Sequence, residues 1–219
     1  MKEVKITGRC LEIYPWMKFG YCFVRDLAPE EPQEVLKEEQ RKVEDYIKGN
    51  LESLVGKAKS ISRFYKAQGE KNRSHIESLL KSIANGKSIK PVNVMVDSVM
   101  IAELRNALLL GVHDLDRIEG NAVLDVSPGG EKFLGIGNRS IETRSNEVVL
   151  RDESGIWASY TQGPDARTVV DAATRNVMIL GFFTPETSRE TMTSGIQDAV
   201  QVMTKAASGK AGEIEITPS

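Results

Sequence analysis

The chain has 219 residues, of which 40% are hydrophobic and 27% charged, a composition typical of a globular protein with a substantial core. The formal net charge of −2 excludes a general attraction to polyanions, so a nucleic-acid partner would need a local basic patch. No apolar run approaches the roughly 20 residues that span a bilayer. The N-terminus is polar and has no signal-peptide core, so we expect a cytoplasmic protein without a membrane partner.

The N-terminal part of the chain predicts two strands separated by a bend at Pro15. Apolar and polar residues alternate over residues 4–13, and residues 19–24 are aromatic and β-branched. Cys10 and Cys22 lie in these strands and form neither a disulfide framework nor a zinc-binding pattern. We therefore expect two buried free thiols in a reducing cytosol, in preference to a redox or nucleophilic role.

Helical segments follow. Apolar residues spaced three and four apart predict a helix over residues 33–57 with a charged, solvated face, and a short separate helical piece over residues 61–68. Ser74 and Glu77 form a capping box that predicts the start of another helix. Arg73 stands just before that helix, where backbone N–H groups and a guanidinium can clamp a phosphate or carboxylate. The alternative for Arg73 is an ordinary surface arginine.

The middle of the chain predicts a strand that feeds a helix. Residues 92–96 are short, apolar and β-branched, which favours a buried strand. Asp97 can cap the helix that follows, and Gly111 is expected to end it. Asn93 and Asp97 lie four residues apart at this strand end, where polar groups often line a pocket. A capping role alone is the alternative for Asp97.

A polar turn is expected directly after that helix. His113, Asp114 and Asp116 are residue types that serve as metal ligands or as an acid–base pair. A metal site would need further ligands, and no local pattern ties another histidine to this turn. We therefore expect no metal, and a ligand pocket or a structural turn remain as alternatives.

The C-terminal half is rich in short strands. They are predicted, in chain order, over residues 123–126, 132–136, 141–143, 147–150, 156–160, 177–183 and 213–216. Ser194 and Gln197 form a capping box that predicts the start of the last long helix. This mixture predicts an α+β or mixed α/β fold, arranged as one domain with a central mixed sheet flanked by helices.

One loop in this half carries candidate chemistry. Backbone amides from Thr161 to Gly163, the amide of Gln162 and the cation of Arg167 can position a carbonyl or phosphate. Arg167 can equally pair with a surface acid. The glycine pattern does not fit a dinucleotide or phosphate loop, and there is no nucleophile motif. We expect no cofactor, and an enzyme of this sequence would activate water itself or leave that activation to the substrate.

The order of these motifs resembles the B3/B4 domain of the bacterial phenylalanyl-tRNA synthetase beta subunit, and more closely freestanding proteins built from that domain. The matching segments are Asn72-Arg73-Ser74, Asn93 with Asp97, Gly111 with Asp114 and Asp116, Gly129-Gly130-Glu131, Arg167-Thr168, and Thr174 to Val177. The resemblance covers roughly residues 60–185, with strands and a long helix before it and a helix and edge strand after it.

The resemblance implies a mixed α/β domain that edits tRNA-Phe mischarged with tyrosine. The partners would be the aminoacyl-tRNA 3′ end and its amino acid, and no DNA is expected. His113 matches the site histidine of the family. The position of the family's editing glutamate reads Pro164, and a Thr-Asn pair before the central helix is replaced near Val99-Met100. These departures imply a different substrate, or a pocket that binds without hydrolysing.

Our leading hypothesis is therefore a protein that hydrolyses the ester of a mischarged aminoacyl-tRNA. Its pocket would be formed by Asn93, Asp97, His113, Asp114, Thr161 and Gln162. His113 or Gln162 would orient the attacking water or the amino acid, and amides near Gly163 would stabilise the oxyanion. The runner-up is a non-catalytic module that binds an amino acid or a tRNA end. A third reading is a small-molecule enzyme that is indifferent to tRNA.

Overall fold

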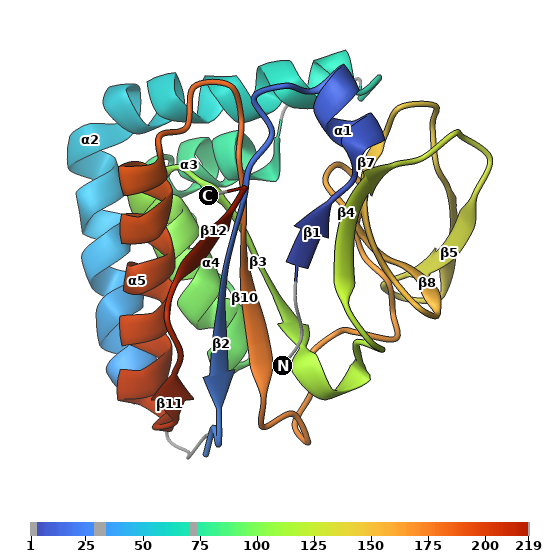
Figure 1. Cartoon of the computed structure of the whole chain (residues 1–219). Helices are drawn as coiled ribbons and strands as arrows, with labels where there is room; N and C mark the ends of the chain where they lie inside the picture. The colour runs from blue at the N-terminus through green and yellow to red at the C-terminus, as the bar shows by residue number, and fades with distance from the viewer. Residues whose placement is uncertain (1–3, 29–33, 71–73, 219) are drawn as a thin grey trace.

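A computed structural model describes residues 4–28, 34–70 and 74–218 of the chain (Figure 1). The helices are α1 (Gly8–Ile13), α2 (Glu34–Ala67), α3 (His75–Ala84), α4 (Val94–Asn106) and α5 (Arg189–Ala207), with a 3-10 turn η1 (Leu115–Arg117). The strands are β1 (Val4–Ile6), β2 (Phe19–Arg25), β3 (Leu109–Asp114), β4 (Ala122–Val126), β5 (Lys132–Gly135), β6 (Arg139–Glu142), β7 (Val148–Asp152), β8 (Gly155–Ser159), β9 (Gly163–Pro164), β10 (Val177–Phe182), β11 (Lys210–Ala211) and β12 (Glu215–Thr217).

The first sheet has the order β11-β2-β10-β3, with β12 also paired to β2, and its pairs are antiparallel. Helices α4 and α5 pack against it on one side (Figure 1). All six residues of β10 are buried, as the near-continuous apolar run over residues 177–183 predicts for a central strand. One continuous apolar core joins both sheets and includes Phe19, Trp157 and Ile196.

The second sheet has the order β1-β4-β7-β8-β9 and is mixed, because β1 runs parallel to β4 and the other pairs are antiparallel. The hairpin β5–β6 lies beside it and meets it through a bridge between Gly135 and Asp165. The predicted α+β fold with a mixed sheet and flanking helices is confirmed. Within the described ranges, no helix is both long enough and apolar enough to cross a membrane.

The strand predicted over residues 92–96 is wrong, because the chain is helical from Val94 onwards. The side chain of Asn93 accepts hydrogen bonds from the N–H groups of Met95 and Val96, at 3.1 and 2.9 Å, and so starts α4. Most of α4 is buried, so its apolar residues are not confined to one face. A short apolar run in such a helix has the same pattern as a buried strand.

The same helix ends earlier than predicted. It closes at Asn106, and Ala107 adopts the left-handed conformation with φ of 53°. Gly111 therefore does not end a helix but lies inside β3, opposite Leu180 of β10. A Cβ atom at Gly111 would stand 3.3 Å from Cε2 of Phe182, so glycine permits a close approach of that ring. His113 and Asp114 belong to β3 rather than to the predicted turn.

Two further predicted elements differ near the N-terminus. Residues 8–13 form α1 and not a strand, because the side chain of Thr7 caps a helical turn by accepting from the N–H of Cys10 at 3.1 Å. The segment labelled α2 is two helices joined by a kink at Asn50, so the break lies at that residue and not between the predicted segments 33–57 and 61–68 (Figure 1). Its dihedral angles are irregular at Asn50, whose side-chain amide donates to the carbonyl of Tyr46 at 2.9 Å.

The start of α5 also differs from the prediction. The helix begins at Arg189, and its cap is Ser188, whose hydroxyl accepts from the N–H of Thr191 at 3.1 Å. Ser194 therefore lies inside the helix, in its second turn. The predicted start of α3 is confirmed, because the hydroxyl of Ser74 accepts from the N–H of Glu77. The N–H of Ser74 donates to the hydroxyl of Ser62, which in turn donates to the carboxylate of Glu77. Both cysteines are free and buried, as predicted.

Candidate functional site

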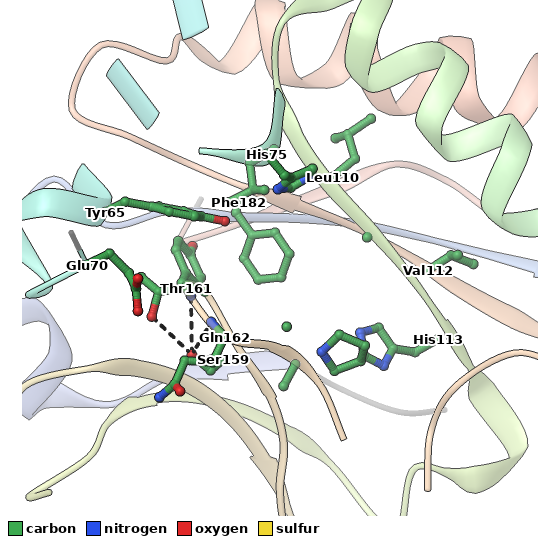
Figure 2. Close-up of a pocket in the computed structure, with 16 residues that line it drawn as sticks. Tyr65, Glu70, His75, Leu110, Val112, His113, Ser159, Thr161, Gln162 and Phe182 are labelled. Atoms are coloured by element: carbon green, nitrogen blue, oxygen red, sulfur yellow. Dashed lines mark hydrogen bonds between the residues drawn. The ribbon is translucent and has the colours of Figure 1, made fainter. Parts of the chain in front are cut away.

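A pocket of about 470 Å³ lies between the two sheets. One wall is β3, the opposite wall is the turn from β8 to β9, and the end of α2 and the start of α3 close one side (Figure 2). Phe182, from β10, projects into this space (Figure 2). Phe182 and Leu109 also border a second hollow of about 260 Å³ that reaches the start of α5. The larger pocket brings together segments from four distant parts of the chain.

Among the described residues that line the pocket, His113 is the histidine whose pKa is strongly lowered. Its side chain is buried, and its Nδ1 lies 2.8 Å from the hydroxyl of Thr168. That hydroxyl also lies 3.3 Å from the carbonyl of Trp157, which can only accept. If the Thr168 hydroxyl donates to this carbonyl, it accepts from Nδ1–H of His113, and Nε2 is then a hydrogen-bond acceptor. The indole of Trp157 packs edge-on against the imidazole, with ring centroids 4.7 Å apart.

Burial lowers the pKa of His113 from 6.5 to about 3. The imidazole is therefore neutral at physiological pH. A neutral ring with a free Nε2 can accept a hydrogen bond from a water or a ligand, but it is a weak base. The structure thus places the predicted His113 in a pocket wall, in a form suited to orienting a hydroxyl or a water.

Thr161 and Gln162 also line the pocket, and a buried carboxylate holds both from behind. Glu147 accepts from the hydroxyls of Ser159 and Thr161 and from the amide nitrogen of Gln162, the last at 2.9 and 3.0 Å. It also accepts from the backbone N–H of Arg144 at 2.8 Å. The amide of Gln162 is therefore fixed by the protein, and Glu147 organises the turn that carries it.

The backbone amides of this turn are already engaged. The N–H groups of Thr161 and Gln162 both donate to the hydroxyl of Ser159, at 3.2 and 3.1 Å. Gly163 has φ of +87°, which lets the chain reverse into β9 beside the pocket. The expectation that free amides near Gly163 would stabilise an oxyanion is not met for the two residues before it.

Arg167 and Asp114 have structural partners outside the pocket. Arg167 forms a two-pronged ion pair with Asp152, at 3.0 Å for each contact, and donates to the carbonyl of Arg117 at 2.6 Å. The buried carboxylate of Asp114 accepts from the hydroxyl of Thr174 at 2.7 Å and lies 3.3 Å from Nε of Arg117. These contacts fix the segments that follow β3 and β9.

The remaining two predicted residues, Asp116 and Arg73, are not among the described residues that line the pocket. Asp116 accepts from the side-chain amide of Asn176 at 2.8 Å, and its backbone N–H donates to Asp114 at 3.0 Å. It therefore shapes the chain after β3 and does not line the pocket. Arg73 lies outside the described residues. Within the described ranges, no group of three or more histidine, cysteine or acidic side chains is arranged to hold a metal ion.

The structure does not bring Asn93 and Asp97 to the pocket of His113. Both border a separate hollow of about 240 Å³ at the start of α4. Asn93 caps that helix, and Asp97 accepts from the backbone N–H of Val92 at 2.9 Å. Burial raises the pKa of Asp97, although this hydrogen bond opposes the shift. The residues expected from the sequence to form one pocket therefore lie in two separate hollows, one at His113 and one at the start of α4.

Several lining residues were not predicted. Tyr65, Glu70 and His75 come from the end of α2 and the start of α3 (Figure 2). Burial opposes protonation of His75, but the hydrogen bond and charge of Glu103 outweigh it and raise the pKa of the imidazole. The distance from Nε2 of His75 to the carboxylate of Glu103 is 3.7 Å. For Tyr65, the one signal in the sequence for a place in the pocket is an aromatic residue within a predicted helix.

Comparison with known proteins gives consistent results. Residues 61–205 match the model of the B3/4 domain family. The beta subunit of phenylalanine–tRNA ligase from Mycoplasma genitalium is 33% identical over 98 residues, and that from Mycoplasma pneumoniae is 28% identical over 97 residues. These matches cover 45% and 44% of the chain but only 12% of each relative. The aligned chain thus spans a small part of the length of these ligase subunits.

A solved structure extends the likeness to the whole fold. An N-terminal fragment of the phenylalanyl-tRNA synthetase beta-subunit from Pyrococcus horikoshii superposes with a TM-score of 0.56 over 99% of this chain and 54% of the fragment. The sequences are 13% identical, so this likeness concerns the fold alone. Because the family match extends over more than half of the sequence, the chain belongs to the B3/4 domain family.

Proposed function

We propose that the protein hydrolyses, in trans, the ester bond between an amino acid and the 3′ end of a mischarged tRNA. One observation carries the proposal: a buried, neutral His113 lines an apolar pocket of about 470 Å³ in a B3/4 domain. A pocket of this size suits an amino-acid side chain together with its ester group. The similarity to beta subunits of phenylalanine–tRNA ligase supports tRNA as the carrier.

In this proposal His113 orients the attacking water. With Nδ1 donating to Thr168, Nε2 accepts a hydrogen bond from the water and directs its lone pair at the ester carbon. Because its pKa is about 3, the imidazole positions the water but does not retain its proton. The carbon–oxygen ester bond breaks, and the proton ends on the leaving ribose oxygen. The neighbouring ribose hydroxyl is the substrate group placed to donate to the oxyanion.

Gln162 acts as a positioning residue in this scheme. Its amide nitrogen is bound by Glu147, so it holds the turn between β8 and β9 against the pocket. Thr161 and Gly163 then contact the substrate from that turn. Arg167 supports the same region through Asp152 and does not contact the substrate. Pro164, which also lines the pocket, adds an apolar surface where an acid would accept a hydrogen bond.

Deacylation of a panel of mischarged aminoacyl-tRNAs tests the proposal. His113→Leu fills a similar volume but lacks the acceptor, so we expect kcat/KM to fall by about 100-fold for whichever pair is hydrolysed. Glu186→Gln changes an exposed carboxylate outside the pocket and serves as the control. Wild-type activity in His113→Leu would show that the site is wrong. Absence of turnover for every pair would show that the reaction is wrong.

A second candidate function is a module that binds the aminoacyl end of tRNA without hydrolysing it. One observation favours it: the N–H groups of Thr161 and Gln162 are engaged by Ser159. The resemblance to the family adds that Pro164 would take the place of its glutamate. Saturable binding of aminoacyl-tRNA without deacylation, weakened steeply by salt, would support this candidate.

A further inference from the structure

We propose that Tyr65 and Glu70 bind the free ammonium group of the aminoacyl moiety, and that the pocket thereby selects aminoacyl esters and amides over free amino acids. The identity of the ligand as an aminoacyl group rests on the proposed function. The assignment of the ammonium to this wall stands on the polar atoms and charges of the pocket itself.

The wall formed by Tyr65 and Glu70 presents unpaired polar atoms. Tyr65 is 7% exposed, and its hydroxyl points into the pocket without a hydrogen-bond partner among the described residues (Figure 2). Glu70 uses one carboxylate oxygen to accept from Arg144 at 2.6 Å, and its other oxygen has no partner in the described part of the chain. A backbone hydrogen bond of 2.9 Å from Glu70 to Tyr65 holds the two residues together.

This arrangement matches an ammonium group. A hydroxyl that opens onto a pocket and has no protein partner takes its hydrogen bond from water or from a bound ligand. A primary ammonium has three N–H donors, so it can donate to the free carboxylate oxygen of Glu70 and to the lone pair of Tyr65 together. The ion pair between Glu70 and Arg144 leaves one carboxylate oxygen for this purpose. Figure 2 shows both residues across the pocket from His113.

The other described residues of the pocket offer no comparable binding site for the carboxylate of a ligand. No lysine or arginine is among the described residues that line it. His113 is neutral, and His75 faces the carboxylate of Glu103. The N–H of Leu110 already donates to Glu103 at 2.8 Å, and two amides of the opposite turn donate to Ser159. Among the described residues that line the pocket, the one side chain that protonation makes a cation is therefore His75, which is already paired with Glu103, so a free amino acid would place its carboxylate beside no uncommitted cation of this set.

The proposal fixes how the substrate lies. The ammonium group binds Tyr65 and Glu70, and the ester carbon and side chain extend past Phe182 towards His113. Hydrolysis converts a neutral ester into an anion beside Glu70. The product is then held less tightly than the substrate, so the same residues that bind the aminoacyl group favour release of the acid.

The test uses three probes made from the same amino acid: the amide, the free acid and the N-acetyl amide. Binding to the full chain is measured by calorimetry at pH 7 for phenylalanine, tyrosine and leucine series. We expect at least one amide to bind, and to bind roughly 10-fold or more tightly than its free acid and its N-acetyl amide. Equal affinity for the three forms, or no binding of any amide, would overturn the proposal.

Two variants test whether Tyr65 and Glu70 cause the preference for the amide. Tyr65→Phe keeps the ring and Glu70→Gln keeps the shape, and each should weaken binding of the amide by roughly 10-fold while the N-acetyl amide is unaffected. Tyr46→Phe and Glu186→Gln change an exposed tyrosine and an arginine-paired glutamate outside the pocket, and serve as matched controls. An unchanged affinity in both wall variants would contradict the assignment.

The outcome is separable from that of the proposed function. If wild-type protein hydrolyses aminoacyl-tRNA and its N-acetylated form equally fast, the ammonium site is wrong and the hydrolysis stands. If the amides bind with the expected selectivity but no aminoacyl-tRNA is hydrolysed, the ammonium site stands and the proposed reaction is wrong.

Discussion

The turn between β8 and β9 and the first turn of α4 were expected to form one site, and they behave differently. In α4, the side-chain oxygens of Asn93 and Asp97 accept from backbone N–H groups of the same segment. In the turn of β8–β9, Thr161 and Gln162 are held by the carboxylate of Glu147, the residue before β7. The first arrangement satisfies a helix end, whereas the second builds one wall of a pocket.

The hydrogen-bond partner of a polar side chain distinguishes these two cases better than its place in the sequence. A residue that hydrogen-bonds its own local backbone is accounted for by the stability of that element. A residue that is held by distant side chains, beside a cavity, is placed there by the fold as a whole. The variants below test this distinction, in order of the free energy they are expected to change.

Glu147→Ala should have the largest effect. It leaves several buried donors without an acceptor, including the hydroxyls of Ser159 and Thr161 and the amide of Gln162. We expect a loss of about 3 kcal/mol in the free energy of unfolding and loss of any deacylation. Chemical denaturation measures the first effect. Glu142→Ala, an exposed glutamate nearby, should change stability by less than about 0.5 kcal/mol, and an equal loss there would refute the role of Glu147.

Acidification should destabilise the protein through His113. Its folded-state pKa of about 3 lies below 6.5, so between these values the unfolded chain binds a proton that the folded chain does not. Stability is present above pH 6.5 and is lost as pH falls, by about 2 kcal/mol between pH 7 and pH 5. The measurement is the difference between wild type and His113→Leu at the two pH values. Parallel pH dependence in both proteins would contradict the buried, neutral state of His113.

Thr168→Val should impair function through the imidazole. The variant removes the acceptor for Nδ1–H, so both tautomers of His113 become accessible and Nε2 loses its fixed role. We expect kcat to fall about 10-fold with little change in KM, and a shifted pH profile. Thr184→Val changes another buried threonine, outside the pocket, and should leave kcat unaltered. A change in KM alone would argue for a packing role of Thr168.

Asn93→Ala should have the smallest effect and should separate the two regions. Loss of the helix cap is expected to cost about 1 kcal/mol in stability, with no change in binding or deacylation at the pocket. Asn93→Ser, which retains a capping oxygen, should restore most of that stability. Impaired substrate binding in Asn93→Ala at a temperature where it is fully folded would return this residue to the site.

The sequence predicted the strands of the sheets better than it predicted the start of helix α4. Residues 19–24 and 177–183 are dense in apolar and β-branched residues, and both are strands because central strands are buried on two faces. Helix α4 is buried on more than one side, so it lacks the periodicity that distinguishes a helix, and residues 92–96 were misassigned. The cap at Asn93 was visible only as a polar residue inside an apolar run.

The site was predicted in part for a similar reason. His113, Thr161, Gln162 and Gly163 were all singled out, and all line the pocket. Glu147 was missed because its side-chain partners lie 12 to 15 residues away in the chain, and their pairing depends on the register of β7 and β8. No local pattern encodes that register, so a buried carboxylate of this kind emerges only when the sheet is assembled.

Phe182 lies at the boundary between the pocket and a second hollow, and this position bears on the length of ligand that the pocket accepts. The ring of Phe182 and the side chain of Leu109 border both the pocket and the hollow beside α5. A smaller residue at position 182 would enlarge both spaces at their common boundary, so the size of this ring sets a limit on the length of the ligand.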